Sequence, residues 1–239
     1  MEILYITIVT ILAGAVGTLT GFGTSTIMVP ILLFFLPLPQ TLLLVGIVHW
    51  FGDIWKVLFF RKGFQWKLIF TFGAAGILAS FLGANIVLSV SETLLSRILG
   101  GFFVFYVLFL FYDPTFKIPK KSTTAVTGGA LSGFLAGIFG VGGAVRSMFL
   151  SAYDLPKAVY IATAGAIGFI IDTTRITTYL ANGIRLDEIY LWGLLFFIPA
   201  SLVGAALAKK IIDRIPQEQF RRVIAVFLFV VGVKFLVFP

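Results

Sequence analysis

The long uncharged stretches of this chain most constrain its fold. Residues 3–52 contain no Asp, Glu, Lys or Arg, and the same holds for residues 68–91, 122–145 and 189–208. About 20 consecutive apolar residues suffice for a helix to cross the hydrocarbon core of a bilayer. Only 12% of the 239 residues are charged, about half the fraction that is usual in a soluble domain. The sequence therefore predicts an all-α polytopic membrane protein.

Turn residues and charges divide the chain into ten apolar segments. They cover residues 3–19, 26–38, 40–60, 68–90, 94–112, 122–139, 144–153, 156–180, 189–208 and 223–238. A glycine break at residues 20–26 follows the first segment, and a second break at residues 137–146 follows the sixth. In hydrocarbon, backbone that leaves the helix must be buried in protein or line a cavity. Both breaks are therefore candidate functional sites.

The two halves of the chain are similar to each other at an offset of 119 residues. The matches are Gly14 with Gly133, Gly21 with Gly140, Gly23 with Gly142, Pro37 with Pro156, Gly46 with Gly165 and Asp53 with Asp172, and Lys56 falls on Arg175. Matches of glycine and charged positions indicate an internal duplication. We expect a first repeat at residues 1–113, a linker at 114–121 and a second repeat at 122–239.

Each repeat is expected to hold one broken helix pair and three full crossings, which makes about 8 to 10 membrane segments in all. The broken pairs either span the membrane or re-enter it. Each half then starts and ends on opposite sides, so the repeats are inverted. The loops at 61–67, 113–121 and 209–222 fall on one side and hold 11 of the 18 basic residues. The positive-inside rule places these loops in the cytoplasm and both termini outside the cell membrane.

Inverted repeats with equivalent interrupted helices are typical of secondary transporters, in which half-helix N-termini point at an anionic substrate. Glycines let the backbone approach a ligand, and a helix start offers free N–H donors. The predicted substrate site combines both breaks: Gly21, Phe22, Gly23, Thr24, Ser25, Gly140, Gly142, Gly143 and Arg146. The competing interpretation is that these glycines only permit close helix packing.

Arg146 is the charged member of this site. It follows Gly143 by three residues, so it cannot easily reach water if the break lies near the membrane midplane. An intramembrane arginine indicates function, and its planar fork suits an oxyanion. The competing interpretation places the break near the outer surface, where Arg146 is solvated.

His49, Asp53 and Lys56 are spaced so that they share one face of a helix. Asp172 and Arg175 are the counterparts of Asp53 and Lys56 in the second half. One interpretation makes His49 and Asp53 a proton relay for coupled transport, because histidine changes charge near neutral pH. The other treats Asp53 with Lys56, and Asp172 with Arg175, as structural ion pairs.

Several classes of function are not expected. The net charge of +8 comes largely from the loops, so no nucleic-acid partner is expected, and the chain has no cysteine. We find no metal-binding His cluster, phosphate-binding loop or catalytic triad, and we expect no cofactor, no resident metal and no enzyme activity. The alternatives kept open are a passive anion channel and an intramembrane enzyme that uses His49 and Asp53. Homo-oligomer formation also stays open.

At the two breaks the sequence resembles the TauE/SafE family of sulfite exporters. The similarity lies in the duplicated hydrophobic halves, the run from Gly21 to Pro30, and the second glycine motif at residues 137–143. Thr24 and Ser25 stand where the family often has glycines, and Phe149 stands where Pro30 would recur. The resemblance implies a transporter, and in particular an exporter, of a small sulfur-containing oxyanion such as sulfite or an organosulfonate.

Overall fold

The structure is a computed structural model of the 239-residue chain. It describes all residues except 62, 88, 113–117, 212–216 and 239, and for residues 20, 110 and 217–224 it describes the backbone alone. The expected boundary between the first repeat and the linker, at residues 113 and 114, therefore lies outside the described residues. Parts of the basic loops at 113–121 and 209–222 lie outside them as well.

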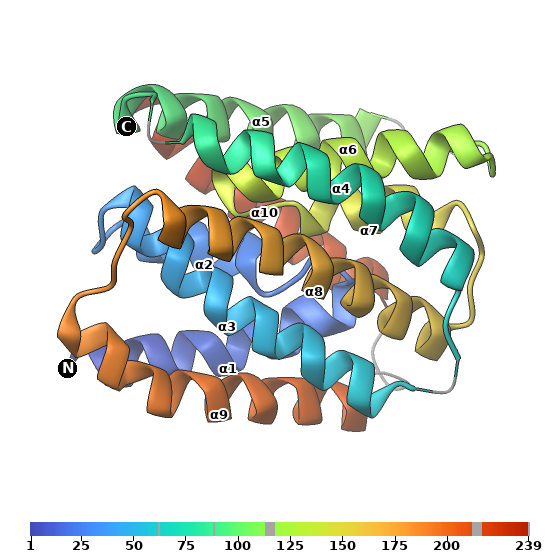
Figure 1. The fold of residues 1–239 in the computed structure, drawn as a ribbon, viewed down its shortest axis with the longest axis horizontal. Helices are drawn as coiled ribbons and strands as arrows, with labels where there is room; N and C mark the ends of the chain where they lie inside the picture. Colours follow the sequence, from blue (N-terminus) through green and yellow to red (C-terminus); the bar gives the residue numbers. More distant parts are fainter. Residues whose placement is uncertain (62, 88, 113–117, 212–216, 239) are drawn as a thin grey trace.

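The described residues form α-helices and no strand (Figure 1), which confirms the predicted fold class. The helices are α1 (Glu2–Thr20), α2 (Ser25–Leu32), α3 (Leu38–Phe59), α4 (Trp66–Ile86), α5 (Glu92–Tyr112), α6 (Ser122–Phe139), α7 (Gly143–Ser151), α8 (Lys157–Ala181), α9 (Glu188–Ile211) and α10 (Gln217–Val237). Within the described residues, seven of them are long and apolar enough to cross a membrane. The protein is therefore a multi-pass membrane protein.

The second helix is shorter than the sequence predicts. We expected residues 26–38, whereas α2 ends at Leu32. Pro30 lies inside this helix and supplies no N–H donor. Pro37 disfavours the helical conformation for the residue before it, and Pro37 itself is the extended N-cap of α3. The two prolines thus make α2 a half-helix of 8 residues, too short to span a bilayer.

The helices pack in pairs that relate the two halves of the chain. By the offset in sequence, α1 corresponds to α6, α3 to α8, α4 to α9 and α5 to α10. The closest neighbours are α4 with α6, α1 with α9, α3 with α8, and α5 with α10. A twofold axis between the halves would produce these pairings, because it exchanges the α1/α9 pair with the α6/α4 pair.

Glycines allow the α4/α6 pair to pack closely. A Cβ atom on three successive glycines of α6 would overlap backbone carbonyls of α4. The clashes are Gly129 with Phe72, Gly133 with Gly76, and Gly137 with Ser80. Such small-residue contacts are a common way to pack helices in membranes, so these three glycines of α6 serve close packing against α4.

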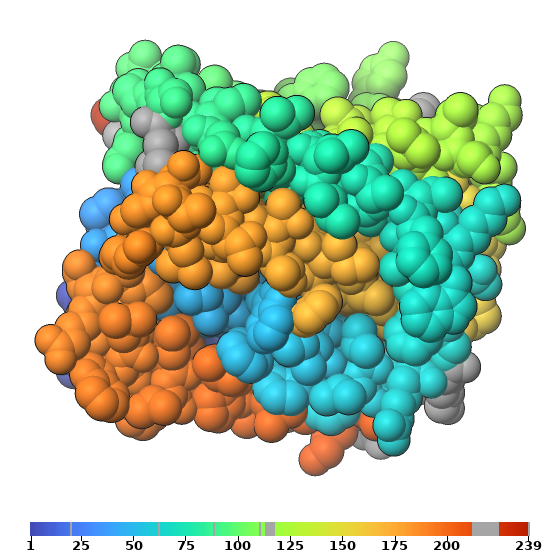
Figure 2. All heavy atoms as spheres, in the orientation of Figure 1, coloured from blue at the N-terminus to red at the C-terminus, as the bar shows by residue number. Residues whose placement is uncertain are grey.

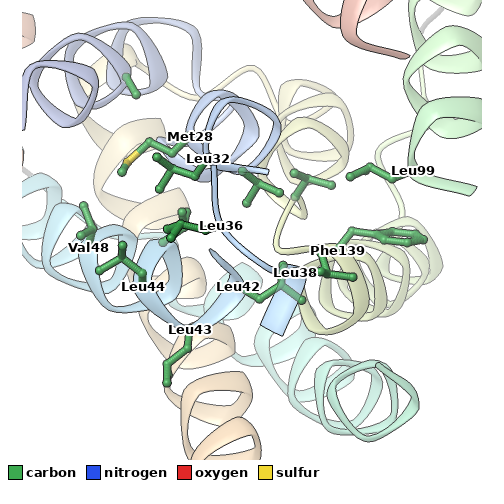
Figure 3. Packing of buried hydrophobic residues seen from close by; sticks show 14 of the residues in the cluster. Met28, Leu32, Leu36, Leu38, Leu42, Leu43, Leu44, Val48, Leu99 and Phe139 are labelled. Carbon is green, nitrogen blue, oxygen red and sulfur yellow. The ribbon is translucent and has the colours of Figure 1, made fainter. Parts of the chain in front are cut away.

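Leucine, valine and phenylalanine side chains fill the interior around α2, α3 and the end of α6 (Figure 3). Met28, Leu32, Leu42 and Phe139 belong to this cluster. The opposite pattern holds on the surface, where large apolar side chains of α4 and α9 are exposed on the face shown in Figure 2. In a membrane protein such side chains face lipid.

The N-terminus and the C-terminal end of α10 lie at the same end of the bundle in Figure 1. Helix α3 begins at this end and runs to the other, where α4 begins. We call the first end the α3-start end and the second the α3-finish end. Helix α8 is antiparallel to α3, so α8 begins at the α3-finish end.

Candidate functional site

The two breaks adopt the same local structure. Helix α1 ends at Gly21 with a φ of 74°, and α6 ends at Gly140 with a φ of 71°. This left-handed conformation favours glycine and is a common way to end a helix. The helices that follow, α2 and α7, have no side-chain cap in the described structure. Their first backbone N–H groups are therefore available as donors.

The two breaks meet in the interior of the bundle. A Cβ atom at Gly143 would overlap the carbonyl oxygen of Phe22 and would lie 3.2 Å from the backbone nitrogen of Gly23. Residues that are far apart in sequence are thus in backbone contact, and only glycine at position 143 permits it. The start of α7 and the first break form one structural unit.

The contact between the two breaks lies beside the midpoints of α3 and α8, two helices of membrane-spanning length. A Cβ at Gly23 would lie 2.7 Å from Nε2 of His49, and a Cβ at Gly168 would lie 2.9 Å from Nη2 of Arg146. His49 is near the centre of the 22-residue α3, and Gly168 is near the centre of the 25-residue α8. Arg146 is only 3% exposed. The charged side chains therefore lie deep in the protein.

A buried network of charged groups joins α3 to α8. Lys56 Nζ lies 2.7 Å from Asp53 Oδ1, and Arg175 Nε lies 2.6 Å from Asp172 Oδ1. His49 Nδ1 lies 2.5 Å from Asp172 Oδ2 and 3.6 Å from Asp53 Oδ2. The two expected ion pairs are present, and His49 contacts the aspartate of the other half more closely than the one on its own helix. The histidine thus links the charged groups of α3 to those of α8.

Glycines on α3 and α8 make room for this network in an equivalent way. A Cβ at Gly46 would lie 3.5 Å from Cζ of Arg175, and a Cβ at Gly165 would lie 3.1 Å from Cβ of Lys56. Each glycine thus makes room on its own helix for the basic residue of the other helix. Both helices can approach closely because neither carries a side chain at this position.

The two halves of the chain differ at one position of this charged centre. The offset of 119 residues matches His49 with Gly168. A Cβ at Gly168 would overlap Oδ2 of Asp53. The space that a side chain at 168 would need is used instead by the carboxylate of Asp53 and the guanidinium of Arg146. One half of the centre thus contributes a histidine, and the other half provides room for an arginine.

Several buried polar atoms at this centre have no hydrogen-bond partner in the described structure. They are Nε2 of His49, Oδ2 of Asp53, Nε of Arg146, and Nη1 and Nη2 of Arg175. A buried donor or acceptor left unpaired costs about 1 to 3 kcal/mol, and more when it is charged. Such a cluster of unpaired groups indicates a place where a ligand or ion supplies the partners.

The charges of the centre favour an anion. Asp53 is paired with Lys56 and Asp172 with Arg175, whereas Arg146 has no ion pair among the described residues. With neutral His49, the three cations and two carboxylates leave one positive charge. An uncompensated buried charge is strongly unfavourable, so a bound anion would stabilise this arrangement.

A small pocket lies on the α3-finish side of this centre. Its lining includes the last turns of α1 and α3 and the first turns of α8, which lie at that end. It is lined by Gly17, Thr18, Gly21, Lys56, Arg146, Tyr160, Ile161 and Ala164. The hydroxyl of Tyr160 lies 2.7 Å from Oγ of Ser147, beside Gly21. The pocket therefore brings Arg146 and the first break together.

The centre is a poor site for a metal cation. Ligand atoms of His49, Asp53 and Asp172 lie within 4.8 Å of one another, a grouping that could hold an ion. However, each carboxylate already contacts a basic side chain, and Arg146 lies nearby. These neighbouring positive charges disfavour a further cation.

The structure brings most of the predicted site residues together. Gly23, Gly143 and Arg146 lie at the meeting point of the breaks. Thr24 and Ser25 are buried at the start of α2. Gly142 packs against the carbonyl of Ser132 rather than toward the charged residues. Gly140 adjoins Arg175, where a Cβ would lie 3.2 Å from Nη1.

Sequence reasoning missed Gly168 and the tyrosines Tyr160 and Tyr179. Gly168 could have been found, because it breaks the repeat at the place of the only histidine. The tyrosines carry no such signal, since their roles depend on the path of the breaks. Tyr179 donates a hydrogen bond to the carbonyl oxygen of Gly137 at the end of α6.

The fold and the buried charged centre define a polytopic membrane protein of the transporter class. A family model described as sulfite exporter TauE/SafE matches residues 6–235, and the chain belongs to this family. It is also 24% identical to a protein of Methanocaldococcus jannaschii described as a probable membrane transporter, over 96% of this chain and 93% of that protein. No solved structure matches the chain. The expected family is thus confirmed.

Proposed function

We propose that this membrane transporter is a secondary transporter of a small oxyanion, with the two breaks and Arg146 forming the substrate site. The observation that carries the proposal is the position of Arg146. It is buried where the breaks meet and has no ion pair among the described residues. Uncapped starts of α2 and α7 supply further N–H donors beside it.

The proposed substrate class is a small sulfur-containing oxyanion, such as sulfite or an organosulfonate. The family description names sulfite, and the planar fork of an arginine can bind two oxygens of one anion at once. Lys56 also lines the pocket beside Arg146. A small and compact anion fits such a site better than a large carboxylate would. Export is the proposed direction in the cell.

Alternating access is the proposed mechanism. The helix pairs match those that a twofold axis would produce, and α1 and α6 run in opposite directions in Figure 1. Both features support two inverted repeats, the first at residues 1–113 and the second at 122–239. In such transporters one repeat moves against the other around a fixed central site. The pocket at the α3-finish end fits a state that is open toward that end.

The test is uptake of labelled sulfite and organosulfonates into proteoliposomes that contain the purified protein. We expect saturable flux that competing sulfur anions inhibit. The absence of flux for every sulfur anion would contradict the substrate class. Single-channel currents would favour the alternative of a passive anion channel, because an alternating-access cycle is far slower than a pore.

The contact between His49 and Asp172 supports proton coupling. His49 is the only histidine, and it links the charged residues of both repeats. We expect His49→Gln to keep saturable sulfite flux but to lose the response of that flux to an imposed pH gradient, because glutamine cannot carry a proton charge. Initial rates with and without the gradient measure this. An unchanged gradient response in the variant would remove His49 from the coupling.

We also propose that the α3-finish end faces the cytoplasm and that both termini lie outside the cell membrane. The basic residues near this end support the orientation. The chain has no cysteine, so single cysteines can report sidedness. We expect Phe64→Cys, in the α3–α4 connection, to react with a membrane-impermeant thiol reagent only from the cytoplasmic side, and Asn182→Cys only from outside. Reaction of Phe64→Cys from outside would reverse the orientation.

A further inference from the structure

Arg175 carries more unused hydrogen-bonding capacity than the ion pair with Asp172 explains. The side chain is fully buried, and only its Nε has a hydrogen-bond acceptor in the described structure. Nη1 and Nη2, which carry the other four N–H donors, form no hydrogen bond there, although the hydroxyl of Tyr179 lies beside the guanidinium. An ion pair alone does not need an arginine, because Lys56 forms the equivalent pair with Asp53. The free edge of the guanidinium therefore needs another explanation.

This free edge faces the second break. A Cβ at Gly140 would lie 3.2 Å from Nη1 of Arg175, and a Cβ at Gly46 would lie 3.5 Å from the same atom. Both positions are glycines, so neither residue places a side chain against the guanidinium. Gly140 also ends α6 in the left-handed conformation. The N–H of Gly140 is bonded to a carbonyl oxygen of α6, so the donors that an oxyanion would meet here are the nitrogens of the guanidinium.

The place of Arg175 is equivalent to the pocket beside Arg146. The pocket is lined by Gly21, Lys56 and Ile161, and their counterparts at an offset of 119 residues are Gly140, Arg175 and Leu42. Gly21 and Gly140 have the same conformation. The surroundings of the second break therefore contain three matching positions of such a pocket, with an arginine in place of the lysine.

In the structure these parts are closed by side chains. Methyl groups of Leu42 and Val29 lie 3.0 Å from the position of a Cβ at Gly140. The hydroxyl of Tyr179 donates a hydrogen bond to the carbonyl of Gly137. Leu42 lies near Phe139 in the apolar cluster of Figure 3. Side chains thus fill the space beside Gly140, while the equivalent region at the other end holds a pocket.

We propose that Nη1 and Nη2 of Arg175, which lie beside Gly140 where no side chain intervenes, form a second subsite for the same small oxyanion. It fills when the α3-start end opens and Leu42 and Tyr179 move away from the second break. The inference rests on the proposed transport function and adds a residue to it. The anion then passes between Arg146 and Arg175 during one transport cycle.

The test uses Arg175→Lys, which keeps the charge that pairs with Asp172 but loses the fork. Labelled sulfite is offered to membrane vesicles of both orientations. We expect the half-saturating concentration to rise about tenfold for sulfite offered from the α3-start end and to change less than twofold from the other end. Arg185→Lys is the matched control, because Arg185 is exposed and follows α8 at the same end. It is expected to leave both values unchanged.

The outcomes separate this inference from the proposed function. If the wild type transports sulfite and Arg175→Lys weakens uptake equally from both ends, or not at all, Arg175 acts only as a structural partner of Asp172 and the inference fails. If the wild type transports no anion, the proposed function fails first. Should Arg175→Lys not fold, Leu42→Ala provides the second measurement. Opening space beside Gly140 is expected to lower the half-saturating concentration at the α3-start end alone, and an unchanged value would overturn the inference.

Discussion

Arg146→Gln is expected to abolish saturable sulfite flux while the protein stays folded. The variant removes the one positive charge at the centre that no carboxylate balances. Loss of one partner from a buried, hydrogen-bonded charge pair costs about 2 to 5 kcal/mol, which corresponds to a roughly 30- to 4,000-fold weaker interaction with the anion. Initial rates of labelled sulfite uptake into proteoliposomes measure the effect.

Stability distinguishes this role of Arg146 from a structural one. A buried arginine without an ion pair costs folding free energy, so Arg146→Gln is expected to keep or raise the Tm. A structural arginine would give a lower Tm together with the lost flux. Arg146→Lys keeps the charge without the planar fork. Its sulfite flux is expected to lie between the flux of Arg146→Gln and that of the wild type. Arg61→Gln is the control, because Arg61 is exposed just beyond the end of α3. Unchanged flux in Arg146→Gln would remove the arginine from the site.

The fold class could be predicted because it depends on the hydropathy and charge of long stretches of the chain rather than on single residues. Uncharged runs such as residues 3–52 leave no alternative to membrane helices in this sequence. The helix ends could be predicted where glycine or proline determines the backbone, as at Gly21 and Gly140. The end of α2 could not, because the combined effect of Pro30 and Pro37 depends on how the following residues pack.

The sequence predicts which residues of one helix lie together at the candidate site, but it does not predict which residues of different helices contact each other. The spacing of His49, Asp53 and Lys56 indicates a shared helix face, and this is a property of one helix. The contact of His49 with Asp172 depends on how α3 crosses α8, and no local pattern records that crossing. Gly46 and Gly165 set the crossing distance, since each faces the basic residue of the opposite helix. The repeat in the sequence aligns these residues without showing that they touch.

Arg175 shows how the same sequence pattern supports two roles. Its spacing from Asp172 predicts an ion pair, and the pair is present. That prediction accounts for one nitrogen of the guanidinium and leaves the other two unexplained. Their surroundings depend on where α6 ends, which is a tertiary feature. The ion pair with Asp172 was thus predicted correctly, while the surroundings of the other two nitrogens of Arg175 were not.

Gly143→Ala is expected to lower both the flux and the Tm strongly. A Cβ at this position would overlap the carbonyl oxygen of Phe22, and a backbone atom cannot rotate away as a side chain can. The start of α7 would have to separate from the first break. Forcing an extra methyl into a packed interior costs about 1 to 3 kcal/mol or more, which lowers Tm by several degrees in a chain of this size. The separation also moves Arg146 away from the break.

A matched glycine tests whether this effect belongs to the meeting point of the breaks. Gly101 lies within α5, and a Cβ there would lie 3.8 Å from Leu236, an ordinary contact. Gly101→Ala is expected to keep the wild-type flux and to keep or raise the Tm, because alanine favours a helix by roughly 0.5 to 1 kcal/mol over glycine. Thermal unfolding in detergent and sulfite uptake measure both variants. If Gly143→Ala behaved like Gly101→Ala, the breaks would be free to separate, and their contact would not hold Arg146 in the site.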